Sequence, residues 1–215
     1  MRITLALKLP KRVKMTTEEE ILCAAESEML ERGYEGARMR GIAEKAEINK
    51  GLLHYYFKSK EALLSQVFER TFKDIFQTLN DVFESNRPLY EKIELAVFAY
   101  SDFICKRPKL PFFIISEMNR NAKKHLQRMH KANAKPPFGR LVQEIEAGKI
   151  SGLVRQDYNS KHFVLNMMSL VLFPLIAKPM VMFMNDLNET QFKELLQNRK
   201  QEIARALITQ IKPIN

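Results

Sequence analysis

The sequence predicts an all-α protein of about nine helices. No proline lies between Lys11 and Arg87, so the first half of the chain lacks the residue that most strongly interrupts helices. Apolar residues recur at helical spacing along most of the 215 residues, and no strand-like alternation of useful length occurs. With 46% hydrophobic residues, the chain has the composition of a folded globular protein.

The first half of the chain predicts four helices, over residues 17–32, 39–46, 50–56 and 59–84. The first helix begins where Thr16 and Thr17 stand three residues before two glutamates, which is a capping-box spacing. It ends at Gly33, because glycine adopts a left-handed conformation without strain. Ser59 marks the start of the fourth helix, whose apolar stripe faces a core.

The second half predicts five more helices, from Pro88 to about Ile104 and then over about residues 112–125, 138–148, 161–184 and 190–211. The helix after Pro88 is apolar on two faces, so it should lie inside a bundle. Pro174 lies within residues 161–184 and is expected to kink that helix, because proline removes one backbone hydrogen bond and clashes with the preceding turn.

The net charge of +10 is unevenly distributed. Residues 1–14 hold five basic residues and no acidic one, and residues 106–140 hold ten basic residues and one acidic residue. Such basic segments favour an acidic partner such as nucleic acid or an anionic membrane, although a basic run is more often only a solvated face.

The cysteines and the N-terminus indicate a cytoplasmic protein. Cys23 and Cys105 lie far apart, without the spacing of a disulfide framework, a zinc site or a redox pair. The apolar run from Ile3 to Leu7 is shorter than that of a secretion signal. Residues 1–15 are therefore interpreted as a basic arm that is a candidate for the minor groove of DNA, or translation begins at Met15.

Two short predicted helices between Arg38 and Lys60 have the spacing of a helix-turn-helix. Ala43 is the small residue that lets the two helices cross closely, and Ile48 and Leu53 supply apolar contacts from the turn and the second helix. Asn49 is a good N-cap for the second helix. The side of that helix left exposed suits phosphates and base edges in a major groove, and it carries Lys50, Gly51, His54, Tyr55 and Lys58. The alternative is an ordinary helical hairpin with a solvated basic face.

Residues 17–64 resemble the N-terminal domain of the TetR family of bacterial regulators. The motifs that carry the resemblance are Gly33-Tyr34, Ile42-Ala43, the string from Lys50 to Phe57, and Lys60-Glu61-Ala62-Leu63. The resemblance implies a helix-turn-helix DNA-binding domain over residues 16–62 and a helical effector-binding and dimerisation domain over residues 63–215. It also implies roles for single residues: Lys50, Gly51 and Tyr55 near bases, and His54, Tyr56 and Lys60 near phosphates.

Three positions depart from the family's pattern. Glu47 stands where the family most often has glycine, which would cost about 1–2 kcal/mol if that residue is left-handed. Ala37 replaces the usual threonine, so that cap is weak, while Arg38 beside it offers a phosphate ligand. His54 replaces the usual tyrosine, which leads to the hypothesis that DNA affinity varies between about pH 6 and 7.5. An unchanged pH profile in His54→Tyr would remove that hypothesis.

Beyond Leu64 the resemblance is one of architecture. It implies a homodimer through the last two predicted helices, and two recognition helices about 34–36 Å apart on a near-palindromic operator. It further implies a repressor that a small apolar effector releases from its operator.

The Met-rich helix over residues 161–184 can line an adaptable pocket, although plain core filling is the alternative for each methionine. The candidate walls of the effector pocket are Phe98, Phe103, Phe112, Phe113, Met167 and Phe173, with Glu117 either as a polar anchor or as the salt-bridge partner of Arg120 or Lys124.

Other functional classes are not favoured. Residues 163–184 are long enough to span a bilayer, but their polar residues and prolines favour a buried helix. The sequence shows no nucleophile with its base, no acidic dyad, no phosphate-binding glycine loop and no metal-ligand spacing, so neither an enzyme nor a cofactor or metal is expected. The alternative function is a ligand-independent basic protein that associates with DNA, or a helical interaction protein.

Overall fold

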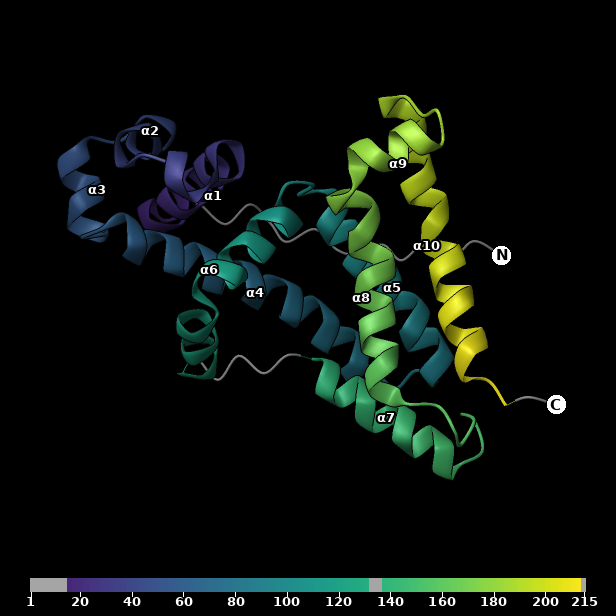
Figure 1. Ribbon diagram of the computed structural model, residues 1–215. Helices are drawn as coiled ribbons and strands as arrows, with labels where there is room; N and C mark the ends of the chain where they lie inside the picture. The colour runs from purple at the N-terminus through teal and green to yellow at the C-terminus, as the bar shows by residue number, and fades with distance from the viewer. Residues whose placement is uncertain (1–14, 132–136, 214–215) are drawn as a thin grey trace. The chain divides into compact units, whose positions relative to one another are not determined.

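The structure, a computed structural model, describes residues 15–131 and 137–213 and places ten α-helices in them (Figure 1). No strand occurs in these residues, so the predicted all-α class is confirmed, with one helix more than the nine expected. The chain divides into two compact units, one that ends at Val67 and one that begins at Phe68.

The first unit contains α1 (Thr17–Gly36), α2 (Met39–Lys45), α3 (Lys50–Tyr56) and the start of α4 (Lys60–Glu84). The predicted capping box is present at the start of α1, where the amide of Glu19 donates to Thr16 Oγ1 and the Glu19 carboxylate accepts from the Thr16 amide at 2.8 Å. Gly33 has φ 69°, so the regular part of α1 ends where the sequence predicted and one further turn follows.

The core of the first unit follows from the apolar spacing of its helices. Ile21, Ala25 and Ile42 are completely buried, and so is Leu53 on α3. Ala43, the expected close-crossing residue, is buried as well. Ile42, Ala43 and Leu53 of the predicted helix-turn-helix are therefore core residues, whereas Ile48 is only half-buried.

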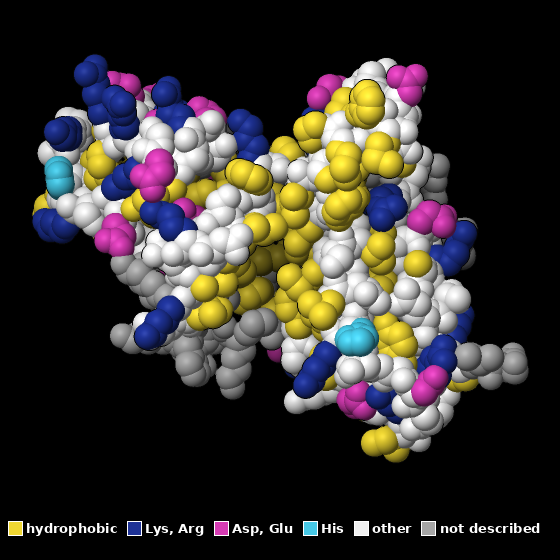
Figure 2. Space-filling view, in the orientation of Figure 1, with side chains coloured by type: hydrophobic (Ala, Val, Ile, Leu, Met, Phe, Trp, Pro, Cys, Tyr) yellow, Lys and Arg dark blue, Asp and Glu magenta, His cyan; other side chains and the backbone are white. Residues whose placement is uncertain are grey.

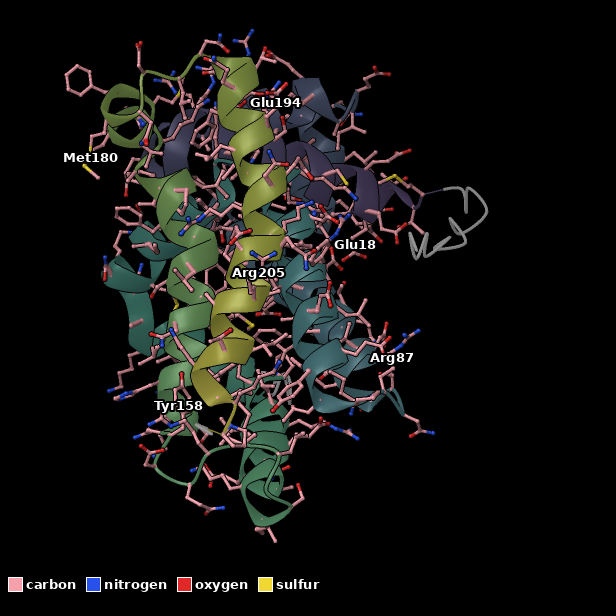
Figure 3. The ribbon with its side chains drawn as sticks, turned by 90° about the vertical axis from the view of Figure 1, so that its right-hand side faces the viewer. Glu18, Arg87, Tyr158, Met180, Glu194 and Arg205 are labelled. Atoms are coloured by element: carbon pink, nitrogen blue, oxygen red, sulfur yellow. The ribbon has the colours of Figure 1, made fainter. Side chains whose placement is uncertain are left out.

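The second unit contains the rest of α4, followed by α5 (Leu89–Cys105), α6 (Leu110–Lys131), α7 (Phe138–Ile150), α8 (Ser160–Ile176), α9 (Lys178–Met184) and α10 (Glu189–Ile211). Helix α5 packs against α8 and α10, and α8 lies beside α10 in Figures 1 and 3. Ile93, Ala96 and Val97 on α5 are completely buried, which confirms that this helix lies inside the bundle.

The single helix predicted over residues 161–184 is wrong, because the structure forms two helices there, bent by 79°. Pro174 lies inside α8, and the break falls at Ala177 instead, just before Pro179 in the first turn of α9. Proline suits a first turn because the amide it lacks has no partner there. Within α8, proline leaves the Leu170 carbonyl without its usual donor, and Arg199 Nε of α10 donates to that oxygen at 3.4 Å. The neighbouring helix thus supplies the donor that Pro174 lacks.

No single helix in the described part of the chain is long and apolar enough to cross a membrane. Helices α8 and α9 together pass that test of length and composition, as a bent pair.

Candidate nucleic-acid interface

The turn between α2 and α3 is built around a left-handed glutamate. Glu47 has φ 54°, which confirms the conformation considered for it. The amide of Ile48 donates to the Ala43 carbonyl at 3.0 Å, and the amide of Glu47 donates to the Glu44 carbonyl at 3.2 Å. These two bonds are the Schellman pattern that ends a helix, with glutamate at the position where glycine is usual. The fold therefore accepts the strain and keeps the turn short.

Helix α3 is fixed at its start and along its inner side. The amide of Leu52 donates to Asn49 Oδ1 at 2.8 Å, so the predicted N-cap is confirmed. A Cβ at Gly51 would lie 3.2 Å from the same oxygen, which is a tight approach to the cap. Leu53 and Phe57 are buried and hold the inner side of the helix and its end. The side-chain oxygen of Asn49 therefore caps α3.

The outer side of α3 presents cations and aromatic rings to solvent. Tyr55 is 73% exposed and Tyr56 is 39% exposed, with their rings edge to face at 5.5 Å. Lys58 Nζ lies 5.9 Å from the centre of the Tyr55 ring. Lys50, Gly51 and His54 are also exposed, and Figure 2 shows lysine and arginine side chains gathered around α3. Ammonium groups, hydroxyls and flat rings can contact phosphates and base edges, so this face has the chemistry that the sequence predicted for it.

The two cations expected to flank α3 have different surroundings. Arg38 is exposed at the start of α2 and makes no side-chain hydrogen bond to cap that helix. Lys60 Nζ donates to the Glu35 carbonyl at 3.3 Å and lies 4.5 Å from the centre of the Tyr34 ring. Lys60 therefore joins the start of α4 to the end of α1, and an ammonium group with three donors can do this and still bind a phosphate.

Sequence reasoning missed a group of charged residues between α1 and α2. Lys45, the last residue of α2, forms ion pairs with Glu28 and Glu31 of α1, and Glu28 is only 3% exposed. The signal was present in the sequence, because Glu28 falls among the apolar positions of α1, where an acid is uncommon. Its partner was not evident, because the two residues lie on different helices.

The residues expected to line an effector pocket are spread between the interior and the surface of the second unit. Phe113, Glu117 and Met167 are buried, whereas Phe112 and Phe173 are 67% and 53% exposed. Phe98 and Phe103 are half-buried. A small cavity of about 10 Å³ between α5, α8 and α10 is lined by other residues, among them Cys105 and Arg199. The effector pocket stays a prediction.

Glu117 lies in an ion pair of the second unit. Its carboxylate accepts from Arg120 at 2.8 Å and lies 3.6 Å from His125 Nε2. The salt bridge to Arg120, one of the two roles considered for Glu117, is therefore present. Among the residues that the structure describes, no group of three or more His, Cys, Asp or Glu is arranged to hold a metal ion.

Residues 21–67 match the sequence model of the bacterial regulatory proteins of the tetR family. The HTH-type transcriptional repressor NicS of Pseudomonas putida is 29% identical over 73% of this chain and 74% of its own length. The HTH-type transcriptional repressor NemR of Escherichia coli is 31% identical, over 41% of this chain and less than half of its own length, 44%. The structure of the ketosteroid transcriptional regulator KstR2 of Mycobacterium tuberculosis shares the fold with a TM-score of 0.71 at 17% identity, over 94% of this chain and 98% of that one.

Helix α3 is capped at its start, buried on its inner side and exposed on a cationic and aromatic face. Together with the family match, this geometry identifies a DNA-binding transcriptional regulator of the helix-turn-helix class. Over residues 21–67 the chain carries the sequence pattern of the tetR family of bacterial regulatory proteins. The family match and the first compact unit end at the same residue, Val67.

Proposed function

We propose that this protein is a cytoplasmic repressor that binds a near-palindromic operator as a homodimer and leaves it when a small apolar effector binds the second unit. The observation that carries the proposal is the outer face of α3, where Lys50, His54 and Tyr55 are exposed on a helix whose inner side is buried. Two such helices related by a two-fold axis would read half-sites about one turn of DNA apart, roughly 34–36 Å. The repressors NicS and NemR support the direction of regulation.

Exposed apolar side chains on α8 and α9 support the homodimer. Phe183 is 87% exposed and Met184 is 72% exposed, and α9 has no buried residue although six of its seven residues are apolar. Figure 2 shows hydrophobic side chains along α8 and α9, and Figure 3 shows Met180 pointing outward from α9. A monomer rarely exposes a continuous apolar surface of this kind, whereas interfaces between subunits do. The surface lies on the first of the last two helices predicted from the sequence, residues 161–184.

An apolar effector fits the composition of the second unit. Phe113 and Met167 are buried there, and unbranched methionine side chains repack around ligands of varied shape. The effector must bind better to a conformer whose recognition helices are badly spaced for DNA, because a ligand shifts an equilibrium only through a difference in affinity. KstR2, which shares this fold, is named a ketosteroid transcriptional regulator, and ketosteroids belong to the apolar class of compound proposed here.

Two substitutions test the assignment of α3. Lys50→Ala removes a proposed base contact, so it should reduce the preference for the operator over other sequences. Lys60→Ala removes a proposed phosphate contact, so it should weaken binding to all sequences and lower the slope of log affinity against log salt by about one. The measurement is a salt titration of both variants on an operator duplex and on a duplex of scrambled sequence. Equal losses on both duplexes from both variants would contradict the assignment.

One experiment distinguishes the proposed repressor from the alternative, a basic protein that associates with DNA without a ligand. The protein is titrated with the DNA upstream of its own gene, at several salt concentrations and with a panel of apolar small molecules. Selective binding that a compound reverses supports the repressor. Salt-sensitive binding without selectivity or release supports the alternative.

A further inference from the structure

Glu28 is a buried carboxylate in the middle of α1, and two cations meet it. Its side chain is 3% exposed, Arg32 Nε lies 3.1 Å from Oε1, and Lys45 Nζ lies 3.1 Å from Oε2. A buried charge costs several kcal/mol unless it is paired and hydrogen-bonded. The partner from α2 is therefore part of what allows an acid to occupy this position.

The ammonium group of Lys45 contacts three residues of α1. Besides Glu28, Nζ lies 2.6 Å from a carboxylate oxygen of Glu31 and donates to Ser27 Oγ at 3.3 Å. Burial lowers the pKa of Lys45, but its hydrogen bonds to Glu31 and Glu28 outweigh burial and raise that pKa. Three acceptors match the three N–H groups of an ammonium ion. The ammonium group of Lys45 therefore has an acceptor on α1 for each of its donors.

Gly41 makes room for this pair. A Cβ at position 41 would lie 2.6 Å from Glu28 Oε1 and 3.0 Å from the carboxyl carbon. Gly41 and Lys45 are four residues apart on α2, so they share one face of the helix, and that face lies against Glu28. Glu28, Gly41 and Lys45 thus form one contact, which we call the α1–α2 tie.

The tie lies one short turn before the recognition helix. Helix α3 begins at Lys50, after the tight turn at Glu47 that follows Lys45. A rotation of α2 about α1 would therefore be passed on to α3. The apolar contacts of Ile42 and Ala43 hold α2 in place but are non-directional, whereas the ion pair forms only where Lys45 Nζ stays close to the Glu28 carboxylate, at 3.1 Å. A buried ion pair often adds no more stability than an apolar pair of similar size, so stability alone does not explain the tie.

We propose that the α1–α2 tie of Glu28, Gly41 and Lys45 positions the recognition helix, and that it determines how well α3 discriminates an operator from other DNA without contacting DNA itself. The proposal rests on the DNA-reading role of α3. It assigns to Glu28 and Lys45 a function for specificity, exerted through α2.

The test compares Lys45→Met with the double variant Glu28→Leu/Lys45→Met. Each protein is measured for its Tm and for its Kd on two duplexes, one selected by the wild-type protein from a random pool and one of scrambled sequence. Lys45→Met leaves the buried carboxylate of Glu28 with Arg32 as its remaining cation and removes the partner from α2, so the Tm should fall. The double variant removes the charges together, so its Tm should recover while discrimination stays about tenfold or more below wild type, the equivalent of one good base contact.

Two outcomes would overturn the proposal. Discrimination that recovers together with Tm in the double variant would make the tie merely structural. A loss of about one in the salt slope of Lys45→Met would make Lys45 a phosphate contact. If the wild-type protein itself shows no discrimination, the proposed function fails, and this result is distinct from both.

Two further variants serve as controls. Arg40→Met removes a cation from the same helix whose pair with Glu44 is exposed, with side chains 87% and 63% accessible, so discrimination should not change. Lys45→Arg keeps the charge and should retain more discrimination than Lys45→Met. Equal discrimination in Lys45→Arg and Lys45→Met would contradict a role for the ion pair.

Discussion

At the scale of single residues, the left-handed Glu47 is a position where the chain gives up stability in order to make a short turn. Its φ of 54° is disfavoured for a residue with a side chain. We expect Glu47→Gly to raise the free energy of unfolding by about 1 kcal/mol, because glycine adopts this conformation without strain. Urea denaturation at neutral pH measures the change. Glu47→Ala is the control, since it keeps the Cβ and should not gain; a gain equal to that of glycine would show that the strain is not the cause.

The burial of Tyr100 predicts how the free energy of unfolding changes at high pH. Tyr100 is 6% exposed on α5, and burial raises the pKa of its phenol above the usual value of about 10. Above pH 10 the unfolded chain loses this proton while the folded chain keeps it, so stability should fall as pH rises, whereas below pH 10 the shift has no effect. Tyr100→Phe should therefore lose less stability than wild type between about pH 10 and 11. Urea denaturation of both proteins at pH 7, 10 and 11 checks this, and parallel losses would contradict it.

Residues whose environment is local could be predicted, and those whose partner lies elsewhere could not. The cap at Asn49, the capping box at Thr16 and the strain at Glu47 depend on neighbours within a few residues. The ion pair between Glu28 and Lys45 joins two helices, and only packing shows that Gly41 lies against it. The exposed residues of α3 were predicted as a set because the residues that face inward were recognised first.

At the scale of secondary structure elements, α8 shows how a helix can continue past a proline. Apolar periodicity and the proline positions were readable in the sequence, but the donor that replaces the missing amide of Pro174 comes from Arg199 on α10. The place of the break at Ala177 thus depends on tertiary contacts, and no local pattern specifies it.

A double-mutant cycle tests this account of α8. Arg199→Met should cost about 1–2 kcal/mol, because it leaves the Leu170 carbonyl without a donor. In a Pro174→Ala background the new amide can donate to that carbonyl within the helix, so the same substitution should cost less by about 1 kcal/mol. Urea denaturation of the wild type, both single variants and the double variant gives the coupling energy. Additive effects would show that Arg199 does not act through the carbonyl freed by proline.

At the scale of the whole molecule, the two compact units differ in how far the sequence alone predicted their function. The first unit matches a family over residues 21–67, because reading DNA with a short helix restricts which residue types fit. The second unit has to bury apolar surface and pack helices, which many sequences can do. Its helices were therefore predictable apart from the break at Ala177, whereas its effector pocket is not defined by a comparable motif.

The exposed apolar surface of α8 and α9 leads to a prediction about assembly. Phe183→Ser should weaken the homodimer by about tenfold or more, because interfaces depend on a few buried aromatic residues. Since Phe183 is 87% exposed in the single chain, the same change should leave the folding of the monomer nearly unaffected. Sedimentation over a range of concentrations gives the dimer Kd, and binding to a full operator should weaken while binding to an isolated half-site is unchanged. Phe112→Ser is the matched control, since Phe112 is 67% exposed on α6, outside this surface. If Phe112→Ser weakens the dimer and Phe183→Ser does not, the subunits meet through α6 and the apolar surface of α9 has another partner.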